Sequence, residues 1–293
     1  MESVFRQSVK TSSLFSYLKH LYQHHQENIL YVKRLKALKK IMQDQDLHTF
    51  FQPIVDIQTK ETMGFEALNR PGVSDLFTSV DHFYDFVGQT DKVFLFDCFC
   101  RNLSLQRFKG RLPGEMLRKK FVLFLNIHPN VLLDKNYHSG ETMQLLRELD
   151  IKPQQVVFEL TERSAVIDFV EFERVLSHYR SQGYRIAVDD VGSGYNSLKT
   201  LIYLKPEFIK LDRSLIQFID KHSEQQQLVT LLMKYAEQAE TKIIAEGIER
   251  FEELDYLQKI GIHYAQGYAL GKPKMDIQLG GIQVSGDENR GSY

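Results

Sequence analysis

Short apolar runs, each ending in an acid, an amide or a lysine, recur through the central part of the chain. Segments long enough to form a helix separate most of them. Runs of this length are typical of buried strands. Polar groups at the ends of several strands match the arrangement in which the carboxyl ends of barrel strands carry catalysis. The runs span residues 63–68, 121–126, 156–160, 186–190, 208–212, 243–247 and 264–267.

Between these runs, apolar positions recur at helical spacing. The pattern predicts helices, and Gly183 and Gly261 stand where glycines that end a helix are expected. Alternating strands and helices favour a parallel sheet with helices outside it. The predicted helices span residues 80–86, 93–108, 141–149, 168–182, 224–239 and 251–260.

The first strand departs from the parallel arrangement. Residues 50–55 and 63–68 are both strand-like, yet only residues 56–62 separate them. A parallel crossover needs about a dozen residues or more, so these two strands are expected to pair antiparallel. This pairing places Gln52, early in the first strand, beside Glu66, near the end of the second.

The two ends of the chain differ from this body. Residues 1–45 carry apolar positions at helical spacing among lysine, histidine and glutamine, which predicts one or two N-terminal amphipathic helices. We expect them to pack against the main domain or a dimer partner, with the basic residues as a solvated face. Residues 46–275 form the main domain. Residues 276–293, rich in glycine and polar side chains, are expected to be a flexible tail.

Composition narrows the class of protein. Of the 293 residues, 43% are hydrophobic and 26% are charged, which is typical of a globular protein. The net charge of -1 offers no broad surface for a nucleic-acid polymer. Because no apolar run reaches bilayer length and no signal peptide is seen, we expect a cytoplasmic protein without membrane insertion. Cys98 and Cys100 are expected to be buried for structural reasons.

Oxygen ligands at the strand ends point to a hard divalent cation. Glu66, Asn126, Glu159 and Asp189 offer carboxylate and amide oxygens, which suit Mg²⁺ or Mn²⁺ better than zinc. The side chains of Asp189 and Asp190 diverge and could serve two ions that share one carboxylate. Two ions about 3.5–4 Å apart stabilise the attacking and leaving oxygens of a phosphoryl displacement. A role as a helix cap or in a surface ion pair explains any one of these acidic residues by itself. The group of acidic residues together favours a metal site.

Two basic residues complete the candidate chemistry. A lysine inside an apolar strand, Lys210, is costly unless carboxylates pair with it, and Asp189 and Glu246 are expected to flank it. Lys210 could orient an attacking water or neutralise charge at phosphorus; the alternative is a lysine that extends outward between helices. Arg70 could bind a phosphate through two hydrogen bonds, or form an ordinary surface salt bridge.

These motifs resemble those of the EAL-domain family of cyclic-di-GMP phosphodiesterases. Glu66-Ala67-Leu68, followed by Arg70, matches the motif that names the family, and the resemblance covers roughly residues 46–275. So many motifs in the same order make chance similarity remote. The others are Gln52-Pro-Ile, Asn126, Glu159-Leu-Thr-Glu162, Asp189-Asp190 with its Gly-Ser-Gly-Tyr loop, Lys210-Leu-Asp212, Ala245-Glu-Gly-Ile-Glu249 and Gln266-Gly-Tyr268.

The resemblance implies a fold and a reaction. The fold is an α/β protein, a modified (β/α)8 TIM-like barrel with an antiparallel first strand. The reaction is metal-dependent hydrolysis of cyclic-di-GMP to linear 5'-pGpG, which lowers this second messenger in bacterial signalling. Two Mg²⁺ or Mn²⁺ ions per site are implied. A homodimer is implied as well, because in this family the loop after Asp190 links the site to a dimer interface.

The resemblance also implies a role for each matching residue. Lys210 would hold or activate the attacking water, and Glu162 would stabilise the loop after Asp190. Substrate contacts are implied for Gln52, Arg70 and Gln266. The implied catalytic residues are Lys210, Glu66, Asp189, Glu246 and Glu162, and the implied metal ligands are Glu66, Asn126, Glu159, Asp189, Asp190 and Glu246.

Three positions depart from the family pattern. Val191 stands where phenylalanine is usual, Pro71 replaces a tryptophan, and His128 stands where serine is common. They bear on loop packing and ligand affinity, since none is a metal ligand.

The alternative function is a sensor that binds cyclic-di-GMP without cutting it and signals through its N-terminal helices or dimer interface. Family members of that type have generally lost several ligands or the lysine, which are all present here, so the enzyme is favoured.

Overall fold

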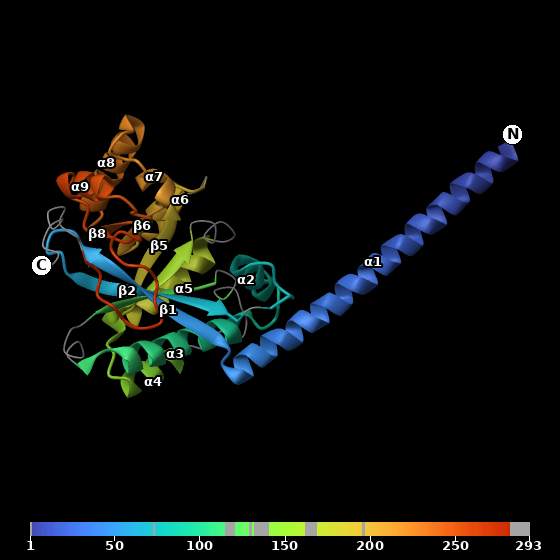
Figure 1. The fold of residues 1–293 in the computed structure, drawn as a ribbon, viewed down its shortest axis with the longest axis horizontal. Coiled ribbons are helices and arrows are strands. Elements are labelled where there is room, and N and C mark those ends of the chain that lie inside the picture. Colours follow the sequence, from blue (N-terminus) through green and yellow to red (C-terminus); the bar gives the residue numbers. More distant parts are fainter. Residues whose placement is uncertain are drawn as a thin grey trace, which may run out of the picture. The chain divides into compact units, whose positions relative to one another are not determined.

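Eight strands close into a barrel, and their order around the barrel follows their order in the sequence. Figure 1 shows the strands as arrows. A computed structural model describes residues 2–72, 74–114, 121–128, 131, 141–161, 169–194 and 197–281. Every run predicted as a strand contributes one. The strands are β1 (Leu47–Asp56), β2 (Thr62–Pro71), β3 (Val122–Asn126), β4 (Val156–Thr161), β5 (Arg185–Val191), β6 (Phe208–Leu211), β7 (Lys242–Ala245) and β8 (Tyr264–Ala265).

The predicted direction of the first strand is confirmed. β1 pairs antiparallel with β8, with Val55 opposite Ala265. Each neighbouring pair from β2 to β8 is parallel, so β1 also runs opposite to its other neighbour, β2. The fold is therefore a (β/α)8-type barrel modified by one antiparallel strand.

Helices follow most of the strands, and all six predicted helices are present. Gly183 and Gly261 follow two of them with φ of 94° and 84°, the left-handed conformation that ends a helix. The pattern did not predict α6, α7 or the 3-10 helix η3, which have eight, four and three residues. The helices are α1 (Glu2–Asp44), α2 (Val80–Gly88), α3 (Val93–Arg111), α4 (Glu141–Glu148), η3 (Pro153–Gln155, a 3-10 helix), α5 (Phe169–Ser181), α6 (Ser197–Leu204), α7 (Arg213–Ile216), α8 (Ser223–Gln238) and α9 (Phe251–Lys259).

An apolar layer fills the barrel between its strands. Because side chains alternate between the two faces of a strand, residues two apart point the same way. On most strands, the residue two positions beyond this layer is polar, which places a polar layer at the carboxyl end of the barrel. The buried members of the apolar layer are Ile54, Val122, Phe124, Val157, Ala187, Phe208 and Ile244.

The chain divides into two compact units, residues 1–47 with 71–87, and residues 48–70 with 88–293. In the first unit, α1 is one continuous helix. Arg34 donates a hydrogen bond to the carbonyl of Leu76 at 3.0 Å, and its guanidinium lies over the ring of Phe77. Leu38 is buried, whereas Val32 is exposed. The predicted partner of the exposed apolar positions stays a prediction, as do the domain boundaries at residues 45 and 275.

Three further expectations concern composition and the tail. Cys98 and Cys100 are both buried, as expected. No helix among the described residues is both long and apolar enough to span a bilayer. Of the tail expected to be flexible, residues 282–293 lie outside the described residues.

Candidate active site

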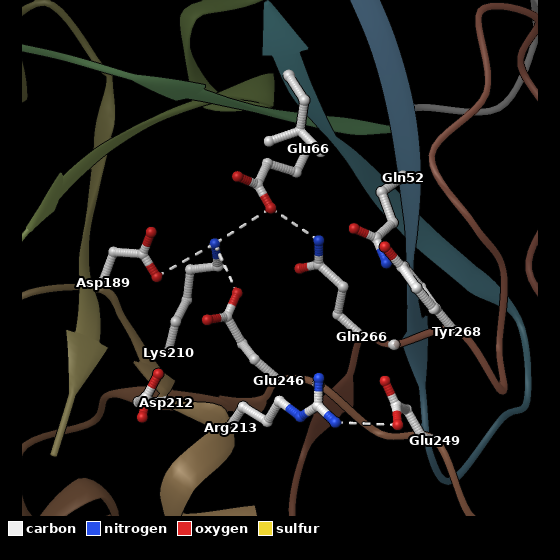
Figure 2. A pocket seen from close by; sticks show the side chains of 13 residues that line it. Gln52, Glu66, Asp189, Lys210, Asp212, Arg213, Glu246, Glu249, Gln266 and Tyr268 are labelled. Atoms are coloured by element: carbon white, nitrogen blue, oxygen red, sulfur yellow. Dashed lines mark hydrogen bonds and ion pairs between the residues drawn. The ribbon is translucent and has the colours of Figure 1, made fainter. Parts of the chain in front are cut away.

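Four carboxylates from different strands and their ends surround one buried lysine. Figure 2 shows Lys210 with Glu66, Asp189 and Glu246. The Nζ atom of Lys210 lies 2.7 Å from Oε1 of Glu246 and 2.8 Å from Oε1 of Glu159. It lies 3.3 Å from Oε2 of Glu66 and 3.3 Å from Oδ1 of Asp189. Only 1% of the lysine is exposed, so it points inward and does not extend between the helices.

Strand geometry explains why these groups meet. Glu159, Asp189 and Lys210 lie near the carboxyl ends of β4, β5 and β6, Glu66 lies in the middle of β2, and Glu246 directly follows β7. These strands are parallel, so their carboxyl ends share one end of the barrel. Each residue stands two positions after a small or apolar inward-facing residue, and alternation turns it inward as well.

Two amides at the ends of other strands hold the carboxylate of Glu66: Asn126 ends β3, and Gln266 directly follows β8. Asn126 donates from Nδ2 to Oε1 of Glu66 at 3.1 Å, and Gln266 donates from Nε2 to Oε2 at 2.7 Å. Gln52, on the antiparallel strand, is buried and donates to the carbonyl of Gly271 at 3.2 Å. The amide oxygen of Asn126 is therefore available to a cation while its nitrogen orients Glu66.

A bulge in β5 brings two adjacent aspartates to the same place. The register between β5 and β6 shifts between Val188 and Val191, and Asp190 has a φ of 57°. Neighbouring side chains of a regular strand point to opposite faces, but a bulge redirects one of them. Carboxylate oxygens of Asp189, Asp190 and Glu246 consequently all lie within 4.8 Å of one another.

Two carboxyls of the cluster, those of Glu159 and Glu246, have raised pKa values. Burial raises the pKa of Glu159 well above its usual range, Glu66 adds to the increase, and Lys210 opposes it. Burial likewise raises the pKa of Glu246 well above its usual range, with a further contribution from Asp189. Burial and the neighbouring carboxylates thus both oppose the charged form of these two groups.

Glu66 and Lys210 favour the charged form in spite of their burial. Burial would raise the pKa of Glu66, yet the pKa is lowered because Lys210, Gln266 and Asn126 stabilise the carboxylate. Burial would lower the pKa of Lys210, but the surrounding carboxylates raise it well above its usual range. The lysine therefore remains an ammonium group across the physiological range.

The carboxylates fit a pair of divalent ions. One candidate ligand group is Glu66, Glu159 and Asp189, and the other is Asp189, Asp190 and Glu246, so that Asp189 belongs to both. Oε2 of Glu159 is buried and accepts no hydrogen bond from any residue in the described part of the chain. Such an oxygen is costly unless a cation or another donor satisfies it. All-oxygen ligand groups suit hard divalent cations.

A pocket of about 340 Å³ opens beside this cluster. Its wall includes residues to which the sequence analysis gave no role, among them Asp212, Arg213, Glu249 and Tyr268 (Figure 2). Three of these stand inside the motifs quoted above, and that position was the available signal. The lining is Gln52, Glu66, Leu68, Asp189, Lys210, Asp212, Arg213, Glu246, Gly247, Glu249, Gln266, Gly267 and Tyr268.

Arg70, His128 and Val191 do not line this pocket. Arg70 is exposed, and its guanidinium lies 5.4 Å from the centre of the Phe50 ring. Glu162 lies outside the described residues. His128 donates its backbone N–H to Asp97 at 3.1 Å. Val191, at the end of the bulged strand, is buried.

Comparison with known proteins shows which family and which relatives this chain resembles. The EAL domain family matches residues 35–273. Over 251 residues the chain is 29% identical to the probable cyclic di-GMP phosphodiesterase PdeB of Escherichia coli K12, covering 82% of this chain and 45% of that protein. It is 27% identical to the probable cyclic di-GMP phosphodiesterase PdeA of the same organism, covering 82% of this chain and 32% of that one. The chain thus spans less than half the length of these relatives.

Solved structures agree. The calcium and cy-diGMP complex of Klebsiella pneumoniae BlrP1 aligns with a TM-score of 0.70 and 28% identity, covering 82% of this chain and 58% of that one. A standalone EAL protein of Vibrio cholerae O395, in its c-di-GMP-bound form, aligns with a TM-score of 0.68 and 27% identity, covering 80% of this chain and 95% of that one. By sequence and by fold, this chain belongs to the EAL domain family.

Proposed function

We propose that this protein hydrolyses cyclic-di-GMP to linear 5'-pGpG with the help of divalent cations. The observation that carries the proposal is the group of four carboxylates around Lys210 beside a pocket. Relatives named cyclic di-GMP phosphodiesterases and neighbours that hold this ligand with calcium or manganese support it.

In this proposal, two Mg²⁺ or Mn²⁺ ions are held by six residues. Asp189 would be shared between them because it belongs to both ligand groups. The ions would supply Lewis-acid stabilisation of the charge that develops on the phosphoryl oxygens. The proposed ligands are Glu66, Asn126, Glu159, Asp189, Asp190 and Glu246.

Lys210 provides a fixed positive charge close to the reacting phosphate. It is buried and remains an ammonium group, so it is suited to orient the attacking water and to stabilise negative charge at phosphorus. Water adds to phosphorus, the bond to the 3' oxygen breaks, and the product keeps a 5'-phosphate and gains a free 3'-hydroxyl. Gln266 orients Glu66 through its amide, and Gln52 and Arg70 are proposed as substrate contacts.

A product assay tests the proposal. Purified protein is incubated with cyclic-di-GMP and either Mg²⁺ or Mn²⁺, and the nucleotides are separated by chromatography. We expect 5'-pGpG to form, and we expect a chelator to stop its formation. Lys210→Met is the matched control for a contaminating activity. Tight binding with the ligand left intact would instead establish the sensor function.

The homodimer implied by the sequence is also part of the proposal. Leu198, Ile202 and Tyr203 expose apolar side chains on α6, the helix that follows the loop after Asp190. Size-exclusion chromatography with light scattering is expected to show a dimer that Ile202→Glu weakens. A chain starting near Gln43 tests whether α1 contributes to assembly. The cytoplasmic location stays a prediction, which cell fractionation can test.

A further inference from the structure

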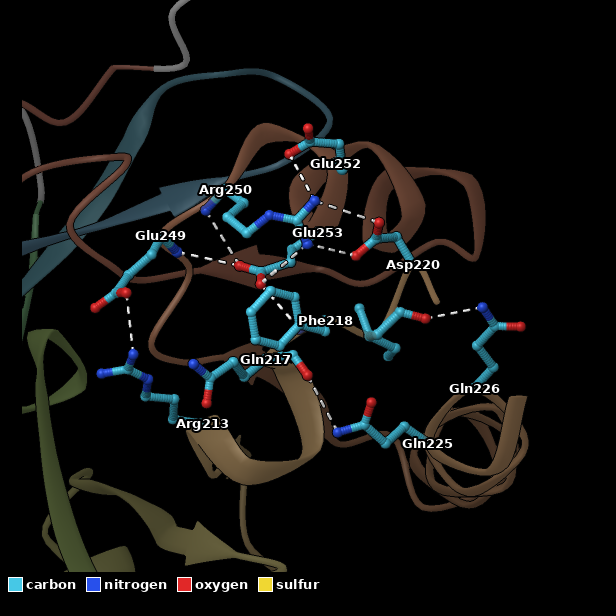
Figure 3. A network of polar contacts seen from close by, with 11 residues as sticks. Arg213, Gln217, Phe218, Asp220, Gln225, Gln226, Glu249, Arg250, Glu252 and Glu253 are labelled. Carbon is cyan, nitrogen blue, oxygen red and sulfur yellow. Dashed lines mark hydrogen bonds and ion pairs between the residues drawn. The ribbon is translucent and has the colours of Figure 1, made fainter. Parts of the chain in front are cut away.

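Glu253 is a buried carboxylate outside the lysine cluster, and it joins two loops at the barrel rim (Figure 3). Its Oε1 accepts a hydrogen bond from the backbone N–H of Phe218 at 2.9 Å. Its Oε2 accepts from the N–H groups of Glu249 at 3.2 Å and Arg250 at 3.1 Å. Only 1% of Glu253 is exposed, so water does not replace these bonds.

The two loops form one wall of the pocket. The loop after β6, which here means the whole connection from β6 to α8 with the short helix α7 inside it, contributes Asp212 and Arg213. The loop after β7 contributes Glu246, Gly247 and Glu249. Glu253 itself does not line the pocket. Its carboxylate holds both loops through hydrogen bonds to their backbones.

Direct contacts also join the two loops to each other. Arg213 Nη2 lies 3.0 Å from Oε2 of Glu249. Gly247 has a φ of 67°, and a Cβ there would lie 2.5 Å from Cγ of Arg213, so the loops approach too closely for a side chain. The pocket wall therefore depends on how accurately one loop is held against the other.

The anchored part of the loop after β6 adopts an uncommon conformation. Phe218 has a φ of 59°, which bulky residues rarely adopt because of steric crowding. Arg250 lies over its ring at 5.0 Å and pairs with Asp220 at 2.8 Å. The bond to Glu253 is the buried member of this set of contacts, since the side chains of Arg250 and Asp220 are partly exposed.

An ordinary helix cap does not account for this arrangement. Capping α9 requires an acceptor for the N–H groups at its own start, which Oε2 provides. Oε1 instead accepts a hydrogen bond from Phe218, which lies in the loop after a different strand, β6. A glutamine at this position has one acceptor oxygen and cannot serve both sets of donors.

We propose that Glu253 is a positioning residue that holds the Arg213 and Glu249 wall of the pocket and thereby sets the affinity for substrate. This inference rests on the proposed function for its substrate, cyclic-di-GMP. Glu246 is fixed separately, because its backbone N–H donates to the carbonyl of Leu211 at 3.1 Å next to the barrel strands. Loss of the Glu253 bond therefore acts on KM more than on kcat.

The kinetic test compares Glu253→Gln with Glu252→Gln. Both substitutions remove one negative charge from the first turn of α9, but the side chain of Glu252 is 62% exposed and pairs only with Arg250 among the described residues. We expect Glu253→Gln to raise KM roughly tenfold with kcat changed less than about twofold, because small misplacements of binding groups are costly. Glu252→Gln is expected to leave both unchanged.

A purely structural role gives a different result. If Glu253 only stabilised the fold, Glu253→Gln would lower the melting temperature and the amount of active protein, while KM of the folded protein would stay at the wild-type value. That outcome overturns the proposal. Should Glu253→Gln fail to fold, Glu253→Asp decides, because its shorter side chain keeps both oxygens near α9 but withdraws them from Phe218. It is expected to raise KM in the same direction, and an unchanged KM rejects the proposal.

Amide hydrogen exchange tests whether Glu253 joins the two loops, and it requires no substrate. In Glu253→Gln we expect faster exchange both in residues 217–221 and in residues 246–250, with β4 and β5 unchanged. Faster exchange in residues 246–250 alone would show a simple cap and overturn the proposal. If the wild type does not hydrolyse cyclic-di-GMP, the proposed function fails, yet this measurement still decides whether Glu253 couples the two loops.

Discussion

The barrel interior holds two layers of opposite character that come from the same strands. Phe208 and Lys210 are two residues apart on β6, and Val157 and Glu159 are two apart on β4. The first member of each pair belongs to the apolar core, and the second belongs to the charged cluster. The chemistry of the side chain therefore changes completely over two residues while the backbone remains one continuous strand.

The two layers have opposite effects on stability. Burial of the apolar layer stabilises the fold, in proportion to the area removed from water. The polar layer places four carboxylates around one ammonium group, and burial of charge costs free energy unless partners compensate it. A cluster that costs stability and lines a pocket indicates selection for function. Substitutions in the two layers should separate these effects.

Asp189→Asn is expected to have the largest effect. Turnover of cyclic-di-GMP should fall by about three orders of magnitude or more, because Asp189 belongs to both ligand groups and aids catalysis by the two ions. The melting temperature without metal should not fall, since one charge leaves a crowded cluster. Retained turnover would contradict the metal assignments, and Glu66→Ala provides an independent test of them.

Phe208→Ala is expected to have the next largest effect, and on stability. Phe208 is buried and its ring packs against Phe124, with 5.2 Å between the ring centres. Loss of the ring should lower the free energy of unfolding by about 3–5 kcal/mol. Denaturant unfolding measures it, with Phe208→Leu as the control that keeps most of the volume. A loss as small as that of the control would show that this layer is not the tightly packed core.

The pH dependence of stability tests the charged layer. Burial and the charge of Asp189 raise the pKa of Asp190 from 3.8 to about 6. A raised carboxyl pKa contributes stability that is fully present below pH 3.8 and is lost as the pH rises to about 6. The metal-free wild type should therefore lose stability relative to Asp190→Asn between these values. If the melting temperatures of the two proteins changed equally with pH across this window, the raised pKa of Asp190 would be contradicted.

Protons and cations should compete for the same carboxylates. Because Glu159, Glu246 and Asp190 all have raised pKa values, a divalent cation must displace protons from them at low pH. Mn²⁺ should raise the melting temperature more at pH 8 than at pH 5. Equal shifts at both values would indicate that the cation binds elsewhere.

Arg70→Ala should have the smallest effect. Arg70 is exposed and contacts Phe50 rather than the lysine cluster. As a substrate contact, it should affect KM by severalfold and leave kcat nearly unchanged, as expected for binding that is equal in ground and transition states. Titration of substrate with the purified variant measures both constants. An unchanged KM would leave Arg70 with the surface role that the sequence also allowed.

The sequence by itself determined the barrel and most of the residues at its carboxyl end. Apolar runs, helical segments between them and the short link between the first two strands were local signals, and each has a direct physical reading. The positions of Glu159, Asp189 and Lys210 toward the ends of these runs then placed them at one end of the barrel. These features depend on neighbours in the sequence, and so they could be predicted.

Only the tertiary structure decided the contacts between loops and the exceptions to alternation. The bulge that turns Asp190 toward Glu246 arises from a register shift between β5 and β6. The bonds from Glu253 to Phe218 and from Arg213 to Glu249 join residues 35 and 36 positions apart. Such contacts form because barrel closure brings consecutive loops together, and no local pattern records that distance. Arg213, which stands outside the quoted motifs, reached the pocket wall for the same reason.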